Sequence, residues 1–182
     1  SDLGEYSSTS SAPNMFEAPE ETPSYENFVS AKTSLTDHLT WQWRLQEITE
    51  TEFRIGVQII GNLDSDGYLK ASVEEVAQLE AVAVELVKAV LSMVQQLDPV
   101  GVAARDLREC LLIQLNLLGL EDSLAAKIVR NHLPDLESKN YPKIARVLKT
   151  SKENIFVAEK VITNLEPRPG RGFSGDEPQY IS

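Results

Sequence analysis

Residues 97–111 read LDPVGVAARDLRECL, and this stretch decides the fold more than any other part of the chain. Asp98 precedes a proline, which disfavours helical backbone angles at the aspartate, and Gly101 accepts angles that other residues resist. A run of strong helix formers follows the turn. We therefore predict that one helix ends at Asp98-Pro99 and that the next spans residues 102–118, with Gly119 ending it.

Helix-capping patterns indicate further helices on both sides of this turn. At four places a hydroxyl side chain is followed three residues later by a carboxylate, a spacing typical of helix N-termini. The pairs are Ser34 with Asp37, Thr49 with Glu52, Ser72 with Glu75, and Thr150 with Glu153. Asp122 or Ser123 is expected to begin another helix. Since no segment alternates as a strand does, we predict an all-α protein of seven to eight helices.

The central helix, residues 102–118, carries apolar side chains on two faces. One stripe holds Leu107, Leu111, Leu115 and Leu118, and the opposite side holds Val102, Leu112 and Ile113 beside Arg105 and Glu109. Two interpretations fit this pattern: the helix is buried between two halves of the protein, or its second face meets a partner. We place the seam at Pro99-Val100-Gly101, between two small packed helical subdomains, residues 35–98 and 99–173.

Charge is unevenly distributed along the chain, whose net charge is −11. Residues 1–34 hold six acids and one lysine among many Ser, Thr and Pro, without an apolar period. We predict that they form a disordered acidic linker. Residues 141–173, in contrast, hold seven bases and three acids. An acidic chain with one basic end is poorly suited to binding nucleic acid by itself and better suited to docking on a basic protein.

The composition also excludes several classes of protein. No window approaches the roughly 18 uninterrupted apolar residues of a membrane span, so we expect no membrane partner. Cys110 is the only cysteine and no secretory signal is visible, which favours a cytoplasmic location. No phosphate-binding loop, nucleophile elbow or zinc-protease motif occurs, so we predict no enzyme activity, no catalytic residue and no cofactor.

One acidic segment imitates the start of a calcium-binding loop. Residues 62–69 read NLDSDGYL, with oxygen-bearing side chains at alternate positions and glycine at the sixth. Val73, however, occupies the twelfth position, where such a loop needs a bidentate glutamate. His38 and His132 lie apart, without metal-ligand spacing. We therefore predict a tight acidic turn and no metal site.

A helix-turn-helix outline near the C-terminal end supports an alternative function. Residues 144–148 are predicted to form one helix, 149–151 a turn and 153–165 a second helix. The second helix would begin with Lys152, Glu153 and Asn154, and an acid is a poor choice among phosphates. A stand-alone DNA-binding domain is thus the weaker alternative, and a packing unit in a helical domain is the stronger.

Four ordered blocks of the sequence carry a resemblance to a known family. They are residues 35–42 (LTDHLTWQ), 59–69 (IIGNLDSDGYL), 97–111 (LDPVGVAARDLRECL) and 165–170 (LEPRPG). Together they resemble the middle region of sigma-54 factors, over residues 35–170. One departure is Glu166, where asparagine is common in the family. Four blocks in the right order are far more specific than any single motif.

The resemblance implies a fold and a function. Sigma-54 factors are bacterial transcription initiation factors that bind core RNA polymerase and keep it closed at promoters until an ATP-hydrolysing activator acts. The region resembled is the all-helical core-binding domain, so we expect a polymerase-binding module. Regions for the activator and for promoter DNA would lie outside this chain, and residues 174–182 would begin a linker toward the promoter-reading domain.

Nine residues are candidates for polymerase docking or for a hinge at the seam. They are Asp98, Pro99, Gly101, Arg105, Asp106, Arg108, Glu109, Arg168 and Arg171. Arg105, Asp106 and Glu109 are placed to brace the seam through charge-assisted hydrogen bonds. Residues 168–171 are expected to be extended and to run along a partner as a strap.

Overall fold

We describe the protein from a computed structural model, which describes residues 33–174. The acidic linker predicted for residues 1–34 and the linker predicted for residues 174–182 lie almost entirely outside these described residues. The remainder forms one compact unit by its internal contacts, beginning at Ser34. It is helical throughout, and no strand occurs among residues 33–174, which confirms the all-α prediction.

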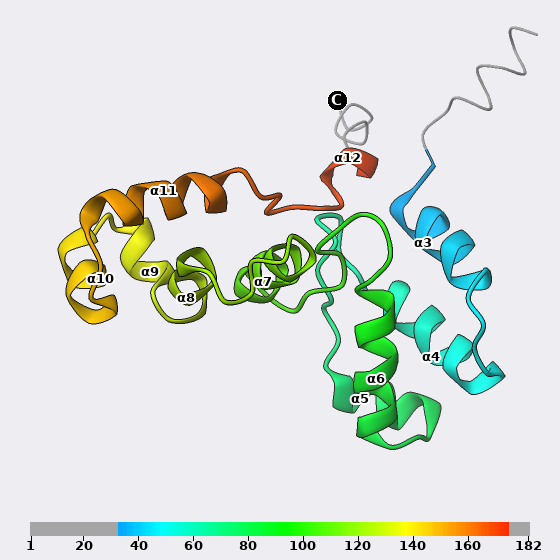
Figure 1. The fold of residues 1–182 in the computed structure, drawn as a ribbon. Helices are drawn as coiled ribbons and strands as arrows, with labels where there is room; N and C mark the ends of the chain where they lie inside the picture. Colours follow the sequence, from blue (N-terminus) through cyan, green and yellow to red (C-terminus); the bar gives the residue numbers. More distant parts are fainter. Residues whose placement is uncertain (1–32, 175–182) are drawn as a thin grey trace, which may run out of the picture. The chain divides into compact units, whose positions relative to one another are not determined.

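Ten helices occupy the described part of the chain, and Figure 1 labels them. They are α3 Leu35–Arg44, α4 Glu50–Ile60, α5 Val73–Glu80, α6 Val84–Val94, α7 Leu107–Leu117, α8 Leu124–Asn131, α9 Leu133–Glu137, α10 Tyr141–Leu148, α11 Lys152–Thr163 and α12 Arg171–Ser174. The two beyond the seven to eight predicted are the short helices α9 and α12. Neither is long enough to show a helical period in the sequence.

The caps explain where most of these helices begin. Both reciprocal bonds of a capping box are present at Thr49 before α4 and at Ser72 before α5, as predicted. The Ser34 hydroxyl also accepts from the Asp37 amide, at 3.0 Å. The fourth predicted cap is wrong by one residue, because Ser151 and not Thr150 caps α11. The Thr150 hydroxyl instead accepts a hydrogen bond from the Asn154 side chain, at 3.1 Å.

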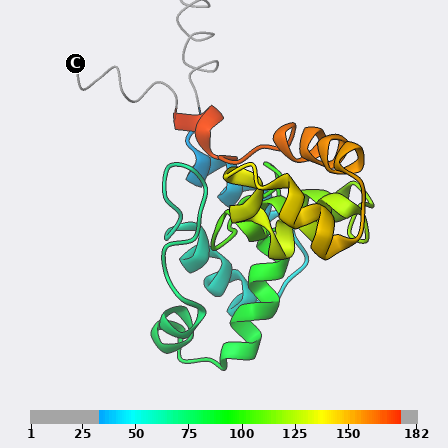
Figure 2. The same cartoon turned by 90° about the vertical axis from the view of Figure 1, so that its left-hand side faces the viewer.

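Helices α3 to α6 enclose the first core, which is centred on fully buried side chains such as Trp43, Ile55 and Val87. Figure 1 and Figure 2 both show α6 beside α4 and α5. The Trp43 indole lies directly over Gly56 of α4, where a side chain would collide with the ring. Its Nε1 donates to the Phe53 carbonyl at 3.1 Å, so the buried indole is both packed and hydrogen-bonded.

Helices α7 to α11 enclose the second core, which includes Leu115, Ile128 and Ile155 at 0% exposure. Val102 and Ala103 pack with the first core, so the division of apolar packing falls between Ala103 and Leu107. The subdomain boundary that we placed between residues 98 and 99 stays a prediction.

The segment between α6 and α7 is longer than predicted, and the prediction that a helix begins at residue 102 is wrong. Ala103 has a φ of 67°, outside the helical region, because its N–H donates to the Gly67 carbonyl at 2.8 Å. The Ala104 carbonyl accepts from the Leu69 amide at 2.9 Å. These bonds to the 62–69 turn replace those of a helix, which begins only after Asp106.

The early part of α7 keeps the predicted apolar stripe, but its end does not. Leu111 and Leu115 are buried in the second core, whereas Leu118 is 62% exposed. The helix ends at Leu117, and Gly119 follows with a φ of 75°, so Leu118 leaves the stripe. No helix among residues 33–174 is both long and apolar enough to cross a membrane.

Candidate functional site

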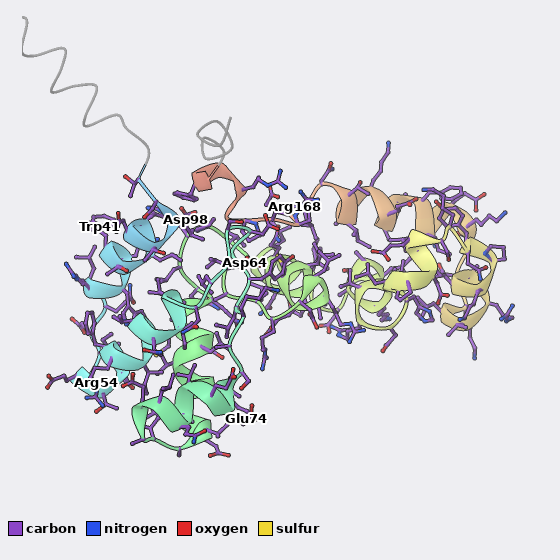
Figure 3. All side chains as sticks on the ribbon, turned by 180° about the vertical axis from the view of Figure 1, so that it is seen from behind. Trp41, Arg54, Asp64, Glu74, Asp98 and Arg168 are labelled. Carbon is purple, nitrogen blue, oxygen red and sulfur yellow. The ribbon has the colours of Figure 1, made fainter. Side chains whose placement is uncertain are left out.

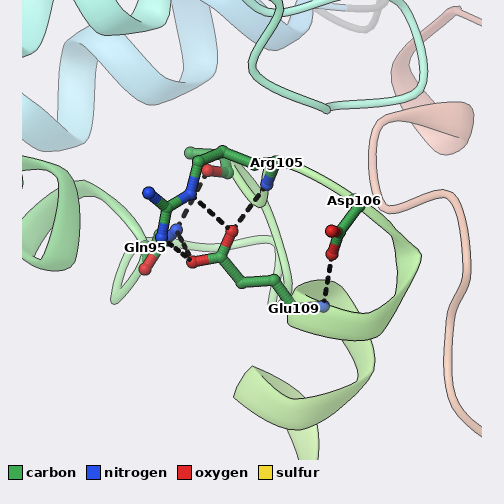
Figure 4. A network of polar contacts seen from close by, with 5 residues as sticks. Gln95, Arg105, Asp106 and Glu109 are labelled. Carbon is green, nitrogen blue, oxygen red and sulfur yellow. Dashed lines mark hydrogen bonds and ion pairs between the residues drawn. The ribbon is translucent and has the colours of Figure 1, made fainter. Parts of the chain in front are cut away.

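A charged network closes the joint between α6 and α7, residues 95–106 (Figure 4). The Arg105 guanidinium makes two hydrogen bonds to the Glu109 carboxylate, at 3.0 and 2.8 Å, and the Arg105 amide adds a third at 2.7 Å. Gln95, at the end of α6, donates to both Glu109 and the Ala103 carbonyl. Gln95 thus links Glu109 to the end of α6, and the role of Arg105 and Glu109 in bracing the seam stays a prediction.

The network controls the protonation of Glu109. Burial by itself would raise the pKa of this carboxyl, but the hydrogen bonds from Arg105 and Gln95 outweigh burial and lower the pKa below its ordinary value. The same pairing raises the pKa of Arg105. Asp106 has a different role from the brace that we predicted: its carboxylate caps α7 by accepting from the Glu109 amide at 2.9 Å.

Asp98 is tied to α3. Its amide donates to the Gln42 side-chain oxygen at 2.9 Å, its carbonyl accepts from the Gln42 amide group, and its carboxylate contacts His38 Nε2 at 3.1 Å. Pro99 follows through a cis peptide bond. Gly101 has a φ of 93°, and a side chain there would lie 2.9 Å from Cys110 Sγ, so both the backbone angle and the space require glycine.

A second connection is made by residues 165–171, which we call the return segment. It leads from α11 to α12 and passes the 62–69 turn (Figure 1). The buried side chain of Gln114 forms a pair of hydrogen bonds with the Glu166 backbone, both 2.8 Å long. The Tyr68 hydroxyl donates to the Pro167 carbonyl at 2.6 Å, and the Gly170 amide donates to the Asp66 carbonyl at 2.8 Å.

Burial also sets the protonation of two side chains beneath the return segment. It raises the pKa of the Tyr68 hydroxyl, with the neighbouring Cys110 thiol as the next cause. It raises the pKa of the Cys110 thiol as well. Both groups therefore keep their protons, and the Tyr68 hydroxyl remains a hydrogen-bond donor to Pro167 at ordinary pH.

The return segment lies along this chain's own turn. Pro169 and Gly170 are buried, while the side chains of Arg168 and Arg171 stay exposed. Figure 3 labels Arg168 on this segment and Asp64 in the turn. Arg171 begins α12, so the predicted extended strap ends at Gly170. The Arg171 guanidinium lies 3.6 Å from the Asp66 carboxylate.

The acidic turn has the predicted form. The Asp64 carboxylate accepts from the amides of Asp66 and Tyr68, at 3.0 and 2.9 Å, and Gly67 has a φ of 96°. One oxygen of the Asp64 carboxylate therefore accepts hydrogen bonds from the backbone of the turn. Within residues 33–174 no group of three or more His, Cys, Asp or Glu side chains is arranged to hold a metal ion.

A groove of about 610 Å³ follows the second face of α7. Leu112 and Ile113 contribute apolar surface, and the charged lining includes Arg105, Arg108 and Arg130. Arg105 is paired with Glu109, and Arg130 donates to the Glu121 carbonyl. The side chain of Arg108 is exposed and makes no hydrogen bond or ion pair with another described residue. The second face of α7 is thus open in this chain.

Sequence reasoning missed the residues that do most of the joining, namely Gln42, Gln95, Gln114, Tyr68 and His38. Glutamine carries no charge and fits many places in a helix, so no sequence pattern indicated that the three glutamines would make these contacts. One signal was present for the first helix: His38 and Gln42 are four residues apart, which places them on one face of α3. That face meets Asp98 (Figure 3).

The helix-turn-helix outline is present, with Lys149 ending α10 at a φ of 55° and α11 packed against α10. Its second helix begins with Lys152 and Glu153, while the Asn154 side chain is hydrogen-bonded to Thr150. The Asn154 side chain, which is the amide side chain at the start of α11, therefore already has a hydrogen-bond partner within the chain.

Comparison with known proteins supports the family. The profile described as "Sigma-54 factor, core binding domain" matches residues 24–182. A curated RNA polymerase sigma-54 factor of Salmonella typhimurium is 36% identical over 181 residues, covering 95% of this chain and 37% of the relative. The sigma-54 factor of Azotobacter vinelandii is 34% identical, covering 94% and 36%, and that of Escherichia coli is 34% identical, covering 89% and 35%.

The chain thus spans a little over a third of the length of these relatives. The residues matched by the profile include every residue that the structure describes. The four blocks on which the resemblance rested contain most of α3, the 62–69 turn, most of the joint with the start of α7, and most of the return segment. We conclude that this chain belongs to the sigma-54 factor family, in the part described as the core-binding domain.

Proposed function

We propose that this chain docks onto bacterial core RNA polymerase and carries out no catalysis of its own. The observation that carries the proposal is the match of residues 24–182 to a family described as a core-binding domain. Contacts with promoter DNA and with an ATP-dependent activator belong, in this proposal, to the longer factor. The setting would be the bacterial cytoplasm.

The physical basis of docking is surface complementarity. The net charge of −11 favours approach to a basic protein surface, and electrostatic attraction of this kind speeds encounter. The α7 groove supplies apolar contacts from Leu112 and Ile113 beside the unpaired Arg108. Arginine next to apolar surface is typical of the residues that dominate binding energy. Arg168 and Arg171, both exposed, extend the candidate surface along the return segment.

The first test is titration of the chain with purified core RNA polymerase, followed by size-exclusion co-elution, with duplex DNA as the control. We expect a stable complex with polymerase and negligible binding to DNA. Binding to duplex DNA that falls steeply with salt would instead favour the stand-alone DNA-binding alternative. Absence of polymerase binding by a correctly folded chain would overturn the docking proposal.

Charge reversal then locates the surface. Arg108→Glu is expected to weaken polymerase binding by about tenfold, since losing an interface arginine commonly costs more than about 1 kcal/mol. The matched control is Lys88→Glu, because Lys88 is also an exposed cation without a partner among the described residues. By net charge alone, both variants should approach a basic surface more readily, so equal affinities of the two variants would mean that the α7 groove is not the docking surface.

We further propose that the joint between α6 and α7, residues 95–106, acts as a hinge. Asp98, Pro99 and Gly101 lie just before the division between the two apolar cores, and no buried side chain among the described residues belongs to both cores. Strain during initiation would then open the joint before either core unfolds. Native-state hydrogen exchange tests this: we expect amides of the joint to exchange at lower free energy than those of α4 and α8. Equal protection across both cores and the joint would exclude an independently opening hinge.

A further inference from the structure

A second groove lies beside the second core, and none of the joint residues discussed above lines it. It has a volume of about 480 Å³ and is formed by the start of α8, the end of α10 and one face of α11. None of the nine candidate docking residues lines it. It is therefore a separate surface, which neither the resemblance nor the proposed function assigned.

The lining of this groove is mainly apolar. Leu120 and Leu124 contribute from the α8 side, and Val157 and Val161 contribute from α11. Val157 is 64% exposed, although the neighbouring positions Ile155 and Ala158 are buried. The helix thus presents a valine to solvent next to its core-facing side. A volume of this size is within the range of binding sites that accept a few side chains or a small ligand.

The charge of the groove is opposite to that of the whole chain. Lys127 and Lys149 line it, and none of its lining residues is an acid. Both lysines are exposed and make no ion pair with another described residue. Lys149 is also held in place, because it ends α10 with a φ of 55° and a backbone bond to Ala145. In a chain of net charge −11, two unpaired lysines beside apolar surface select for carboxylates.

We propose that this groove binds a protein segment of core RNA polymerase that carries carboxylates beside apolar side chains. The proposal rests on the proposed docking function and adds the chemistry of one contact. The apolar surface would take the partner's apolar side chains, while Lys127 and Lys149 pair with its acids. A nucleic acid fits less well, because phosphates gain nothing from Val157 and Leu124, and the nearest amide, Asn154, is already bonded to Thr150.

The test is the affinity of single variants for core RNA polymerase. Val157→Asp adds a negative charge at an exposed position, so folding should be retained, and we expect binding to weaken by about tenfold or more. The matched control is Leu45→Asp, because Leu45 is also 64% exposed but is the C-cap of α3, outside the groove. Lys127→Glu should weaken binding by about threefold or more, with Lys88→Glu again as the control.

A photo-crosslinking amino acid placed at position 157 identifies the occupant. We expect crosslinks to a polymerase peptide that contains both acidic and apolar residues, and none from position 45. Full polymerase binding by Val157→Asp, or crosslinks only to DNA, would overturn the groove proposal while leaving docking intact. If the unmodified chain fails to bind polymerase at all, the proposed function fails first, and the groove proposal fails with it.

Discussion

Two sets of contacts join the first core to the second, and they differ in how they are built. The charged network of Gln95, Arg105 and Glu109 connects residues at most 14 positions apart in sequence. The long-range hydrogen bonds of the return segment join residues 52 to 104 positions apart, as at Gln114–Glu166 and Asp66–Gly170. The network uses charged side chains, whereas the return segment uses mainly its backbone. Charged side chains in the sequence therefore indicate the joint. The contacts between distant parts of the chain depend instead on the backbone of the return segment lying close to the 62–69 turn and to α7.

The largest loss is expected from Gly170→Ala in the return segment. The added carbon would lie 2.7 Å from the Ser65 carbonyl oxygen and 2.8 Å from the Gly67 amide nitrogen, both backbone atoms that cannot rotate away. We expect a loss of about 3 kcal/mol in the free energy of unfolding, at the upper end of typical overpacking costs. Urea unfolding at constant pH measures this loss.

The matched control is Gly172→Ala, because a side chain at Gly172 meets nothing within 4 Å. It should change stability by less than about 0.5 kcal/mol. If both variants are neutral, the return segment is not held against the turn in solution, and the comparison between the two connections fails.

A slightly smaller loss is expected from Gln114→Met. This change preserves the volume of a side chain that is 6% exposed but removes both hydrogen bonds to the Glu166 backbone. Leaving those backbone groups without partners should cost about 2 kcal/mol. Gln96→Met is the control, since Gln96 is exposed and its side chain has no partner among the described residues. Equal unfolding midpoints for the two variants would contradict a structural role for Gln114.

The fold could be predicted from the sequence wherever local signals decide it. Capping boxes at Thr49 and Ser72 fixed the starts of α4 and α5, because the hydroxyl and carboxylate serve amides within the same turn. The start of α7 could not be predicted. Ala103 and Ala104 favour helix by composition, but their backbone groups bond to Gly67 and Leu69, more than thirty residues earlier. Tertiary hydrogen bonds thus override local propensity.

The candidate site was predictable to a similar degree. Arg105 and Glu109 are four residues apart and of opposite charge, which indicated their pairing, although Arg105 precedes α7 and pairs with Glu109 from the loop. The docking of Pro169 and Gly170 onto the acidic turn has no such signal, because it depends on which two loops the packed helices bring together. The α8–α11 groove was missed for the same reason: its lining comes from three helices, and each contributes only a few positions.

The charged network should be weaker than the return segment and should depend on pH. Glu109→Gln removes the charge from four hydrogen bonds, three from Arg105 and one from Gln95, and we expect a loss of about 1.5 kcal/mol at pH 7. Because the pKa of Glu109 is lowered in the folded state, its contribution is complete above the ordinary value of 4.5 and is lost as the pH falls through the folded pKa.

Urea unfolding at several pH values between 3 and 7 separates these effects. The difference between the unmodified chain and Glu109→Gln should shrink as the solution is acidified below about pH 4.5. Glu85→Gln, at an exposed position in the first turn of α6, is the control. A difference that stays constant down to pH 3 would mean that the charge of Glu109 contributes nothing to the joint.

The smallest effect on stability is expected from Arg171→Ala. This variant distinguishes a contribution of Arg171 to folding from a contribution to polymerase binding. The guanidinium lies 3.6 Å from Asp66, and the two side chains are 55% and 38% exposed, so the pair should contribute less than about 0.5 kcal/mol. An exposed arginine that does so little for the fold remains available to a partner. We therefore expect polymerase affinity to fall by about threefold or more while the unfolding midpoint stays unchanged. A lower midpoint with unchanged affinity would assign Arg171 to the return segment alone and remove it from the candidate docking surface.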